Sequence, residues 1–525
     1  MNRITEGLLK EFLQEQSLAH ESESKDFEQF CNYAVVSKEY SDSFDIQDIS
    51  VGEGNDTGLD GVAIIVNGRL VESEDEVTDI VNMNGYLDAT FIFVQAKSGR
   101  NFESSEIGTF FYGAKDFFAD DHKLSRNDFL TKKAEISDYI FQHSAKMTRR
   151  SPLCKLYYVT TGKWTNDANL VARIEGERAD LANKDIFDEV SFHPVDSSQL
   201  HKLYRATKDR AVVEINFPNK VTLPDLDEVS QSYLGTLPLE EYFKLIVDDT
   251  GNIQKALFYD NIRDFQGDNT VNKEIGETIN SDNSKARKFV ILNNGITLVA
   301  KNITTIGNRM TLRDYQIVNG CQTSHVLYNY KDAINPNIHI PIRIIGTTDE
   351  NTTNSVIKST NRQTEVKTEE LAAMSEFQKR LESYYETFSD VSRLYYERRS
   401  KQYNGVSGVE KVRIITIPTQ IRVFASMFLD LPHRAGRYYG TLREMIGGNI
   451  FQETHEPIPY YTSAFAYYRG EFLFRSNFID SKYRKFRYHT LIILRYQIAG
   501  EMMPHMNSPK MGPYCEKILA VLASD

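Results

Sequence analysis

Three residues near the start of the chain have the types and spacing that metal-assisted phosphodiester hydrolysis requires. Asp60 precedes an apolar run at 62–66, and Gln95 and Lys97 end a second one at 91–97. Side chains two apart on a strand share a face, so Gln95 and Lys97 are expected side by side. Asp60 and Gln95 offer oxygen ligands to Mg²⁺ or Mn²⁺, and Lys97 can orient a water or stabilise developing negative charge. We therefore predict Asp60, Gln95 and Lys97 as catalytic residues.

The elements around these residues predict an α/β domain over residues 1–210. Apolar runs at 62–66, 91–97, 156–160 and 190–192 predict buried strands separated by helical stretches. Asn67-Gly68 predicts a hairpin after the first strand. Ser24 is the predicted N-cap of a helix that carries Glu28. The predicted domain is a mixed sheet flanked by helices.

This N-terminal pattern resembles the PD-(D/E)xK nuclease superfamily, especially its Mrr-like branch. The resemblance covers about residues 20–200 and rests on Asp60 at a strand start and on Gln95-Ala96-Lys97 in the next strand. It implies a restriction-endonuclease-like fold, with Glu28 as an extra acidic residue, so that the metal ligands would be Asp60, Gln95 and Glu28. The sequence departs from the pattern because Gln95 replaces the commoner Glu, which removes one negative charge.

Other interpretations of the same residues stay open. A lysine at the end of a buried strand commonly just reaches solvent, and Glu28 also fits a solvated helix position. A domain with the fold but a weakened site would bind nucleic acid without cutting it. The sequence therefore leaves a binding module as the alternative to an endonuclease.

Four polar, Asn/Gly/Gln-rich segments lie in the region 211–365, each beside an apolar strand or helix. They are 261–267, 292–297, 317–323 and 359–363. Strands are predicted at 289–292, 297–300, 315–318 and 338–345, and an extended connector at 217–224, which makes this an α+β region. Asn and Gly suit tight loops, but four such loops could also converge on a nucleotide or phosphate. The candidate ligand-binding residues are Asn294, Asn319, Gly320, Gln322, Asn361 and Arg362.

The NNGIT, VNGCQT and STNRQ segments, with the later YYERR at 395–399, resemble the abortive infection phage resistance (AIPR) family. The resemblance covers about residues 220–500. It implies a role in bacterial antiphage defence, and many such proteins carry an N-terminal PD-(D/E)xK-like domain. The loop at 319–323 is also similar to the DGQQR-type loop of ParB/sulfiredoxin-like folds, which leaves a nucleotide-handling sensor as a further alternative.

The third region, 366–525, is predicted to be mostly helical, with a helix beginning at Thr368. Between 391 and 500 there are 17 lysines and arginines against 8 acidic residues, whereas the whole chain carries a net charge of −12. Bases interleaved with aromatic residues suit phosphates and stacked bases, which predicts nucleic-acid binding, with DNA as the expected partner. The predicted contacts are Arg398, Arg399, Lys482, Arg484, Lys485 and Arg487. The alternative is a helical region with inward tyrosines and solvated arginines.

The composition excludes several classes of protein. Hydrophobic residues make up 41% and charged residues 26%, and no apolar run approaches a membrane-spanning length, so no membrane partner is expected. Four widely spaced cysteines without a CxxC pair disfavour a zinc site and a disulfide framework and fit the cytoplasm. The expected partners are nucleic acid and a nucleotide or phage-derived trigger. Cutting both strands of a duplex would favour a homodimer.

Overall fold

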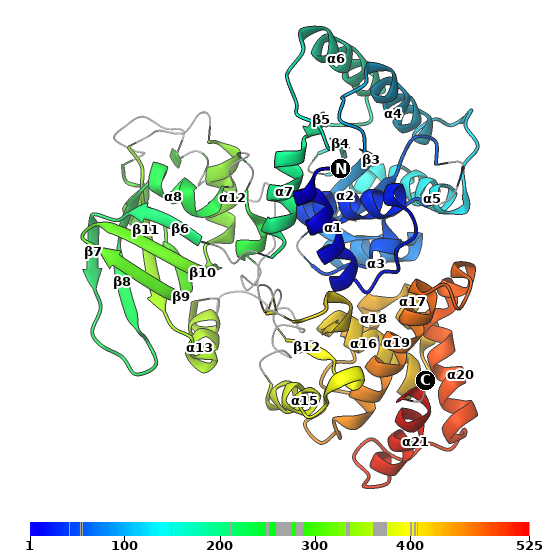
Figure 1. Cartoon of the computed structure of the whole chain (residues 1–525). Coiled ribbons are helices and arrows are strands. Elements are labelled where there is room, and N and C mark those ends of the chain that lie inside the picture. Colours follow the sequence, from blue (N-terminus) through cyan, green and yellow to red (C-terminus); the bar gives the residue numbers. More distant parts are fainter. Residues whose placement is uncertain are drawn as a thin grey trace. The chain divides into compact units, whose positions relative to one another are not determined.

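The computed structural model divides the chain into two compact units. Unit 1 consists of Met1–Lys208 together with Ser375–Asp525, and unit 2 is Asp209–Met374 (Figure 1). The structure describes residues 1–523 except 41, 53, 55, 149, 209–211, 248–250, 252, 259–275, 277, 280–286, 332–336, 361–374, 399–401, 404–405 and 407. The first and third regions predicted from the sequence thus belong to the same unit, and unit 2 is inserted between them in the sequence.

A five-stranded mixed sheet in the order β2-β1-β3-β4-β5 forms the centre of the N-terminal part of unit 1. β1 pairs antiparallel with β2 and β3, whereas β3, β4 and β5 run parallel. The tight Asn67-Gly68 turn joins β1 to β2, with positive φ at both residues, as the sequence predicts. The strands are β1 Gly61–Val66, β2 Arg69–Leu70, β3 Ala89–Lys97, β4 Leu153–Thr160 and β5 Glu189–Val195.

Helices cover both faces of this sheet because its central strands are apolar on both sides. Alternate residues of β3 enter two different cores: Ile92, Val94 and Ala96 pack with α2 and α7, and Phe91 and Phe93 pack with α4 and α5. The helices are α1 Arg3–Glu15, α2 Glu23–Glu39, α3 Glu74–Asn84, α4 Ser104–Phe117, α5 Asp128–Gln142, α6 Ala168–Ala182 and α7 Ser197–Ala206, with a 3-10 turn η1 at Ile46–Asp48.

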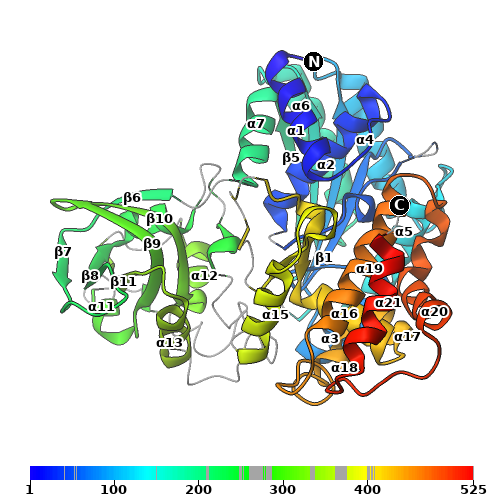
Figure 2. The same cartoon turned by 60° about the horizontal axis from the view of Figure 1, so that its bottom comes forward.

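The C-terminal part of unit 1 is mostly helical. α16 packs against α17, α19 and α20, and α21 packs against α19 and α20, as Figure 2 shows. The helices are α15 Glu376–Glu386, α16 Ile417–Phe428, α17 Pro432–Arg437, α18 Tyr439–Arg443, α19 Ile458–Arg475, α20 Arg487–Ala499 and α21 Met511–Ala523. A 3-10 segment η6, Ser481–Phe486, precedes α20, and two short parallel strands, β12 Tyr395–Glu397 and β13 Ile414–Thr416, lie beside α15 and α16.

Unit 2 is an α+β unit built on a six-stranded sheet in the order β6-β10-β9-β11-β8-β7. Every pairing is antiparallel except that of β9 with β11. The strands are β6 Val212–Asn216, β7 Asn219–Thr222, β8 Gln231–Pro238, β9 Ile296–Ile306, β10 Arg309–Asn319 and β11 His339–Gly346. The helices are α8 Leu239–Ile246, α11 Phe289–Leu292, α12 Cys321–Asn329 and α13 Glu350–Thr360.

The structure corrects three local predictions. The predicted strand at 289–292 is the short helix α11, since four apolar residues fit one helical turn as well as a strand. The connector predicted at 217–224 contains strand β7. Ser22 rather than Ser24 caps α2, because the Ser22 hydroxyl accepts the Lys25 N–H at 3.2 Å. Thr368, the predicted start of a later helix, lies outside the described residues, and the helix described there begins after Ser375.

All four cysteines lie in the described part of the chain, where they are buried and form no disulfide. No described helix combines the length and the hydrophobicity that crossing a bilayer requires.

Candidate active site

Asp60 and Gln95 are in direct contact on neighbouring strands. The Gln95 amide donates from Nε2 to Asp60 Oδ2 at 2.5 Å, and the Ala96 N–H donates to the same oxygen at 2.7 Å. Both side chains are buried, with 8% and 3% of their surface exposed. The pairing of β1 with β3 accounts for the contact, because Gly61 lies opposite Val94 and Asp60 therefore reaches the level of Gln95. The structure thus places Asp60 and Gln95 side by side, while their catalytic role stays a prediction.

Helix α2 fixes the backbone at Asp60. Asn32 is fully buried, and its amide donates from Nδ2 to the Asp60 carbonyl at 2.8 Å. A Cβ at Gly61 would lie 2.3 Å from Asn32 Oδ1, so only glycine allows this close approach of helix and strand. The Val51 N–H also donates to the Asp60 carbonyl, at 3.0 Å. The residue at the strand start is thus held from two sides.

Burial and neighbouring charges disfavour ionisation of Asp60. Burial makes the largest contribution, the Glu28 carboxylate adds to it, and together they raise the pKa of Asp60 to about 7 despite the Ala96 N–H and the Lys97 ammonium. Burial also raises the pKa of Glu28, while the Ser24 hydroxyl, Lys25 and Lys97 lower it. Burial is thus the main cause of both shifts, nearby carboxylates add to it at Asp60, and a bound cation would favour the charged form of both acids.

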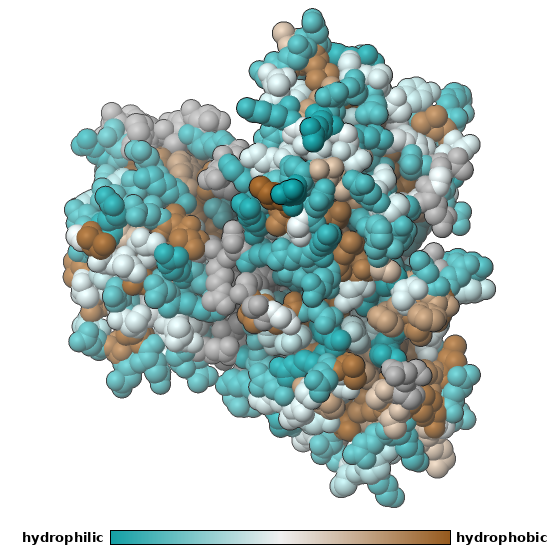
Figure 3. Space-filling view, in the orientation of Figure 1, coloured by the Kyte–Doolittle hydropathy of each residue, from teal (hydrophilic) through white to brown (hydrophobic). Residues whose placement is uncertain are grey.

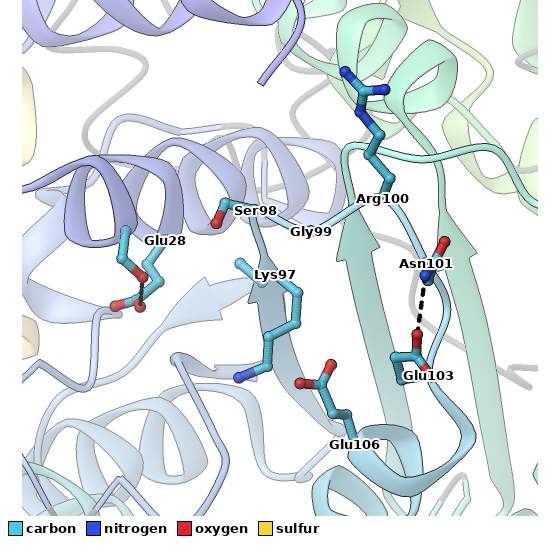
Figure 4. A pocket seen from close by; sticks show the side chains of 10 residues that line it. Glu28, Lys97, Ser98, Gly99, Arg100, Asn101, Glu103 and Glu106 are labelled. Atoms are coloured by element: carbon cyan, nitrogen blue, oxygen red, sulfur yellow. Dashed lines mark hydrogen bonds between the residues drawn. The ribbon is translucent and has the colours of Figure 1, made fainter.

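A cavity of about 230 Å³ opens where β3 ends. Its lining includes Lys97, Glu28, Glu106 of α4, Arg100 and Glu103. In the view of Figure 4 the Lys97 side chain lies between Glu28 and Glu106, and all three line the cavity. Lys97 and Glu28, both predicted from the sequence, thus reach the same space beside the Asp60–Gln95 pair.

The loop after Lys97 is held rigidly against β4. The Thr161 hydroxyl donates to the carbonyls of Ser98 and Gly99 at 3.0 and 2.9 Å. A Cβ at Gly162 would lie 1.7 Å from the Arg100 carbonyl, so the two loops touch through their backbones. This contact fixes one wall of the cavity.

The donor set fits a hard divalent cation of the Mg²⁺ type in chemistry, though with few acids. Asp60 and Glu28 could provide carboxylate oxygens and Gln95 an amide oxygen, and a cation would favour the charged form of Asp60. Within the described ranges, no three or more His, Cys, Asp or Glu side chains are grouped as metal ligands. An ion held here would therefore depend on the Gln95 amide as well as on carboxylates.

Two acidic residues near the cavity, Asp56 and Glu106, were not predicted from the sequence. Asp56, whose Oδ1 accepts the Gly58 N–H at 2.8 Å, adds negative charge near Asp60 from the preceding turn. Glu106 lies in the first turn of α4 and accepts a hydrogen bond from Tyr158 Oη at 2.8 Å. The abundance of Asp and Gly at 52–60 was the only available signal for Asp56, and no sequence pattern distinguishes Glu106.

Three of the four polar loops that could converge on a ligand are in contact in unit 2, as far as the structure describes them. Asn293 donates from Nδ2 to Thr323 Oγ1 at 3.2 Å, and Asn319 donates from Nδ2 to the Thr360 carbonyl at 2.7 Å. Gly320 adopts φ +107° at the start of α12, beside half-buried Gln322, and Asn294 is exposed. Asn361, Arg362 and the loop at 261–267 lie outside the described residues.

Several of the predicted nucleic-acid contacts instead hold unit 1 together. Arg484 is buried and pairs with Asp48, with Asp45 at 3.0 Å and with Glu471 at 2.8 Å. Arg487 lies 3.4 Å from Glu72. Two further ion pairs, Arg422–Glu76 at 3.0 Å and Arg437–Asp75 at 3.4 Å, follow the same pattern. We refer to these pairs as the arginine junction, because acids of the N-terminal part meet arginines of the C-terminal helices.

The other predicted contacts differ in exposure. Arg398 is buried and bonded to Glu382 at 2.7 Å, and so it does not offer its charge to a phosphate. Arg399 lies outside the described residues. Lys482 and Lys485 are exposed beside the exposed rings of Tyr483 and Phe486. Figure 3 shows further hydrophobic side chains on the surface of the C-terminal helices.

Comparison with known proteins relates the second half of the chain to one family. The model of the AIPR protein family matches residues 258–507, which include part of unit 2 and most of the C-terminal helices. The match supports the AIPR resemblance of this part of the chain. Searches of curated proteins and of solved structures give no match.

Proposed function

Proceeding from the AIPR match at residues 258–507, we propose that the chain is an antiphage effector whose N-terminal part is a restriction-endonuclease-like, PD-(D/E)xK domain. This domain hydrolyses phosphodiester bonds of nucleic acid, with DNA as the first substrate to test, and depends on Mg²⁺ or Mn²⁺. The C-terminal half recognises the trigger or holds the substrate. An antiphage role is what the family match suggests, whereas the nuclease rests on the site.

The observation that carries the proposal is the direct contact of Asp60 with Gln95 beside a cavity that Lys97 lines. A divalent cation bound there would supply Lewis acidity and neutralise charge on the phosphate. Asp60, Gln95 and Glu28 would hold it, while Lys97 would orient the attacking water or stabilise the phosphate charge. The shortage of positive charge around Asp60 supports cation binding, because a net negative cavity would otherwise repel a phosphate.

Single substitutions at the site test this function. Asp60→Ala and Lys97→Ala should each lower Mg²⁺-dependent cleavage of plasmid DNA by at least about 100-fold. Both should also abolish protection of cells against phage. Single-stranded DNA and RNA assayed in parallel identify the preferred substrate.

The matched control is Lys163→Ala, which removes an exposed lysine just after the neighbouring strand β4 and should leave cleavage unchanged. Full cleavage by both site variants would contradict the catalytic assignment. In that case the binding-module alternative predicts that Lys97→Ala still weakens DNA binding.

The meeting of three polar loops in unit 2 favours a second candidate function, namely recognition of a nucleotide as a trigger. A nucleotide that binds the folded state should raise the melting temperature of the full chain, and Asn319→Ala should remove the rise. Asn308→Ala, an exposed asparagine in the β9–β10 turn, is the control. If no nucleotide at millimolar concentration raises the melting temperature, this function is excluded.

A further inference from the structure

Glu106 differs from the other two glutamates of the cavity in what holds it. Glu28 is bonded to Ser24 one turn away on its own helix, and Glu103 to Asn101 of its own loop. The Glu106 carboxylate is instead bonded to Tyr158 Oη at 2.8 Å, a residue of strand β4 that is fully buried. The buried Tyr158 phenol donates its hydrogen to this carboxylate and so fixes the direction in which Glu106 points.

Tyr158 connects Glu106 to two of the predicted catalytic residues, Asp60 and Gln95. Tyr158 lies opposite Gln95 in the parallel pairing of β3 and β4, and Gln95 contacts Asp60. Asp60, just before β1, thus lies in line with Gln95 of β3 and Tyr158 of β4. Within this row of three only Asp60 can carry a negative charge, because Gln95 is an amide and burial raises the pKa of Tyr158 far above its usual value.

We propose that Glu106 supplies, from helix α4, the negative charge that Gln95 lacks, and that it strengthens binding of a divalent cation in the cavity. The inference rests on the metal site of the proposed function. Mg²⁺ gives up its water molecules reluctantly and usually keeps several of them. A carboxylate on the cavity wall can accept hydrogen bonds from that water, and loss of such an outer partner typically weakens metal affinity by 10–100-fold. Glu106 is therefore a positioning residue.

The placement of Glu106 also suits a partnership with Lys97. Both side chains line the cavity, as Figure 4 shows, and the Tyr158 hydroxyl holds the Glu106 carboxylate through its hydrogen bond. Lys97 therefore lies between Glu28 and Glu106, one acid from each layer of helices. With the other charged lining residues, Glu103 and Arg100, three glutamates face two bases, so acidic side chains outnumber basic ones in the cavity, which favours a cation.

The test measures Mn²⁺ binding to the full chain by calorimetry without nucleic acid, so that it does not depend on cleavage. Glu106→Gln should weaken Mn²⁺ binding by about 10-fold or more. Tyr158→Phe should weaken it less, since the carboxylate remains but loses its fixed direction. Glu103→Gln removes the same charge from the same loop–helix junction and should change the affinity by less than twofold. Circular dichroism and thermal unfolding show whether each variant folds.

A double variant that moves the carboxylate from position 106 to position 95 distinguishes a role at the metal site from a merely structural one. Adding Gln95→Glu to the Glu106→Gln variant returns the carboxylate to the strand and should restore Mn²⁺ affinity. Failure to restore it, or equal affinities of the Glu106→Gln and Glu103→Gln variants, would overturn the inference. So would Mn²⁺ binding by the wild type that is no tighter than binding by Asp60→Ala.

The two proposals fail in distinguishable ways. Weakened Mn²⁺ binding in Glu106→Gln, with no cleavage by the wild type on any nucleic acid, would retain the role of Glu106 and reject the nuclease. Cleavage by the wild type, with unchanged Mn²⁺ affinity in Glu106→Gln, would retain the nuclease and reject the role of Glu106.

Discussion

The cavity beside Lys97 and the arginine junction both bury carboxylates within unit 1, but they surround them with opposite amounts of positive charge. At the junction, burial alone would raise the pKa of Asp48, yet the guanidinium groups of Arg484 and Arg487 lower it well below its usual range. At the cavity, burial and Glu28 raise the pKa of Asp60 to about 7, and Lys97 offsets this only in part. At the junction guanidinium groups outweigh the effect of burial, whereas at Asp60 burial and nearby carboxylates outweigh the Lys97 ammonium.

This difference separates a structural cluster from a candidate functional one. Acids and bases in balance lock two parts of a protein together and leave nothing for a ligand to neutralise. Acids left short of positive charge raise the energy of the empty site, and a bound cation relieves that cost. The type of residue is the same in both regions, so the local balance of charge carries the information.

Removal of the central arginine should show the largest effect on stability. Arg484→Met leaves Asp45, Asp48 and Glu471 buried without their shared partner, and it should lower the free energy of unfolding by about 3–5 kcal/mol. Urea denaturation of the full chain measures this value. Lys482→Met, an exposed neighbour, should stay within about 0.5 kcal/mol. A loss below about 1 kcal/mol for Arg484→Met would mean that the junction does not hold the two parts together.

The protonation of Asp60 should make stability depend on pH in the opposite direction to that of an ion-paired carboxylate. With its pKa raised to about 7, folded Asp60 keeps a proton that the unfolded chain releases above about pH 4. Its contribution is therefore present below pH 4 and is lost as the pH rises through 7. The free energy of unfolding of Asp60→Asn should increase relative to that of the wild type between pH 4 and 8, by up to about 4 kcal/mol, at about 1.4 kcal/mol per pH unit.

This gain is measured as the difference between the two denaturation midpoints at each pH, without divalent cations. Glu72, whose pKa burial and Asp48 raise to about 7, contributes equally to both proteins and cancels in that difference. Saturating Mg²⁺ should reduce the difference if the cation binds Asp60. A pH-independent difference would contradict the charge shortage at the cavity.

The smallest effect on stability is expected for the exposed bases. Lys482→Ala with Lys485→Ala should change the free energy of unfolding by less than about 0.5 kcal/mol, since neither side chain is buried. If these lysines contact phosphates, DNA affinity falls and the slope of its logarithm against the logarithm of salt concentration drops by about 2. Lys510→Ala, another exposed lysine, is the control. An unchanged salt slope would exclude Lys482 and Lys485 as phosphate contacts.

The strands and the hairpin of the N-terminal sheet were predictable because their signals are local. The apolar run that forms β3 and the Asn67-Gly68 turn each lie within a few neighbouring residues. The helix at Phe289–Leu292 was predicted wrongly for the converse reason, as four apolar residues carry no period. The packing of the C-terminal helices against α3 and η1 was not predictable, because pairs such as Arg484 and Asp48 lie far apart in sequence.

The residues of the candidate site also differ in whether a local signal or a distant partner identifies them. Gln95 and Lys97 share a strand, so their alternation predicted a common face, and Asp60 precedes the adjacent strand. Glu106 acquires its meaning from Tyr158, a partner on a different strand that no sequence spacing indicates. The basic composition of the C-terminal region did not distinguish exposed bases from buried ones, because a count of charges does not reveal that Arg484 and Arg487 are paired inside the molecule.

The insertion of unit 2 between the two segments of unit 1 has a consequence for synthesis on the ribosome. Residues up to Lys208 precede unit 2, yet the guanidinium partners of Asp45 and Asp48 follow it, namely Arg475, Arg484 and Arg487. At about 5–20 residues per second, the early segment waits for tens of seconds before its acids are neutralised. A chain interrupted before Arg484 therefore lacks the guanidinium group that Asp45 and Asp48 share, so the part of unit 1 that bears Asp60 gains these ion pairs only after unit 2 has been synthesised.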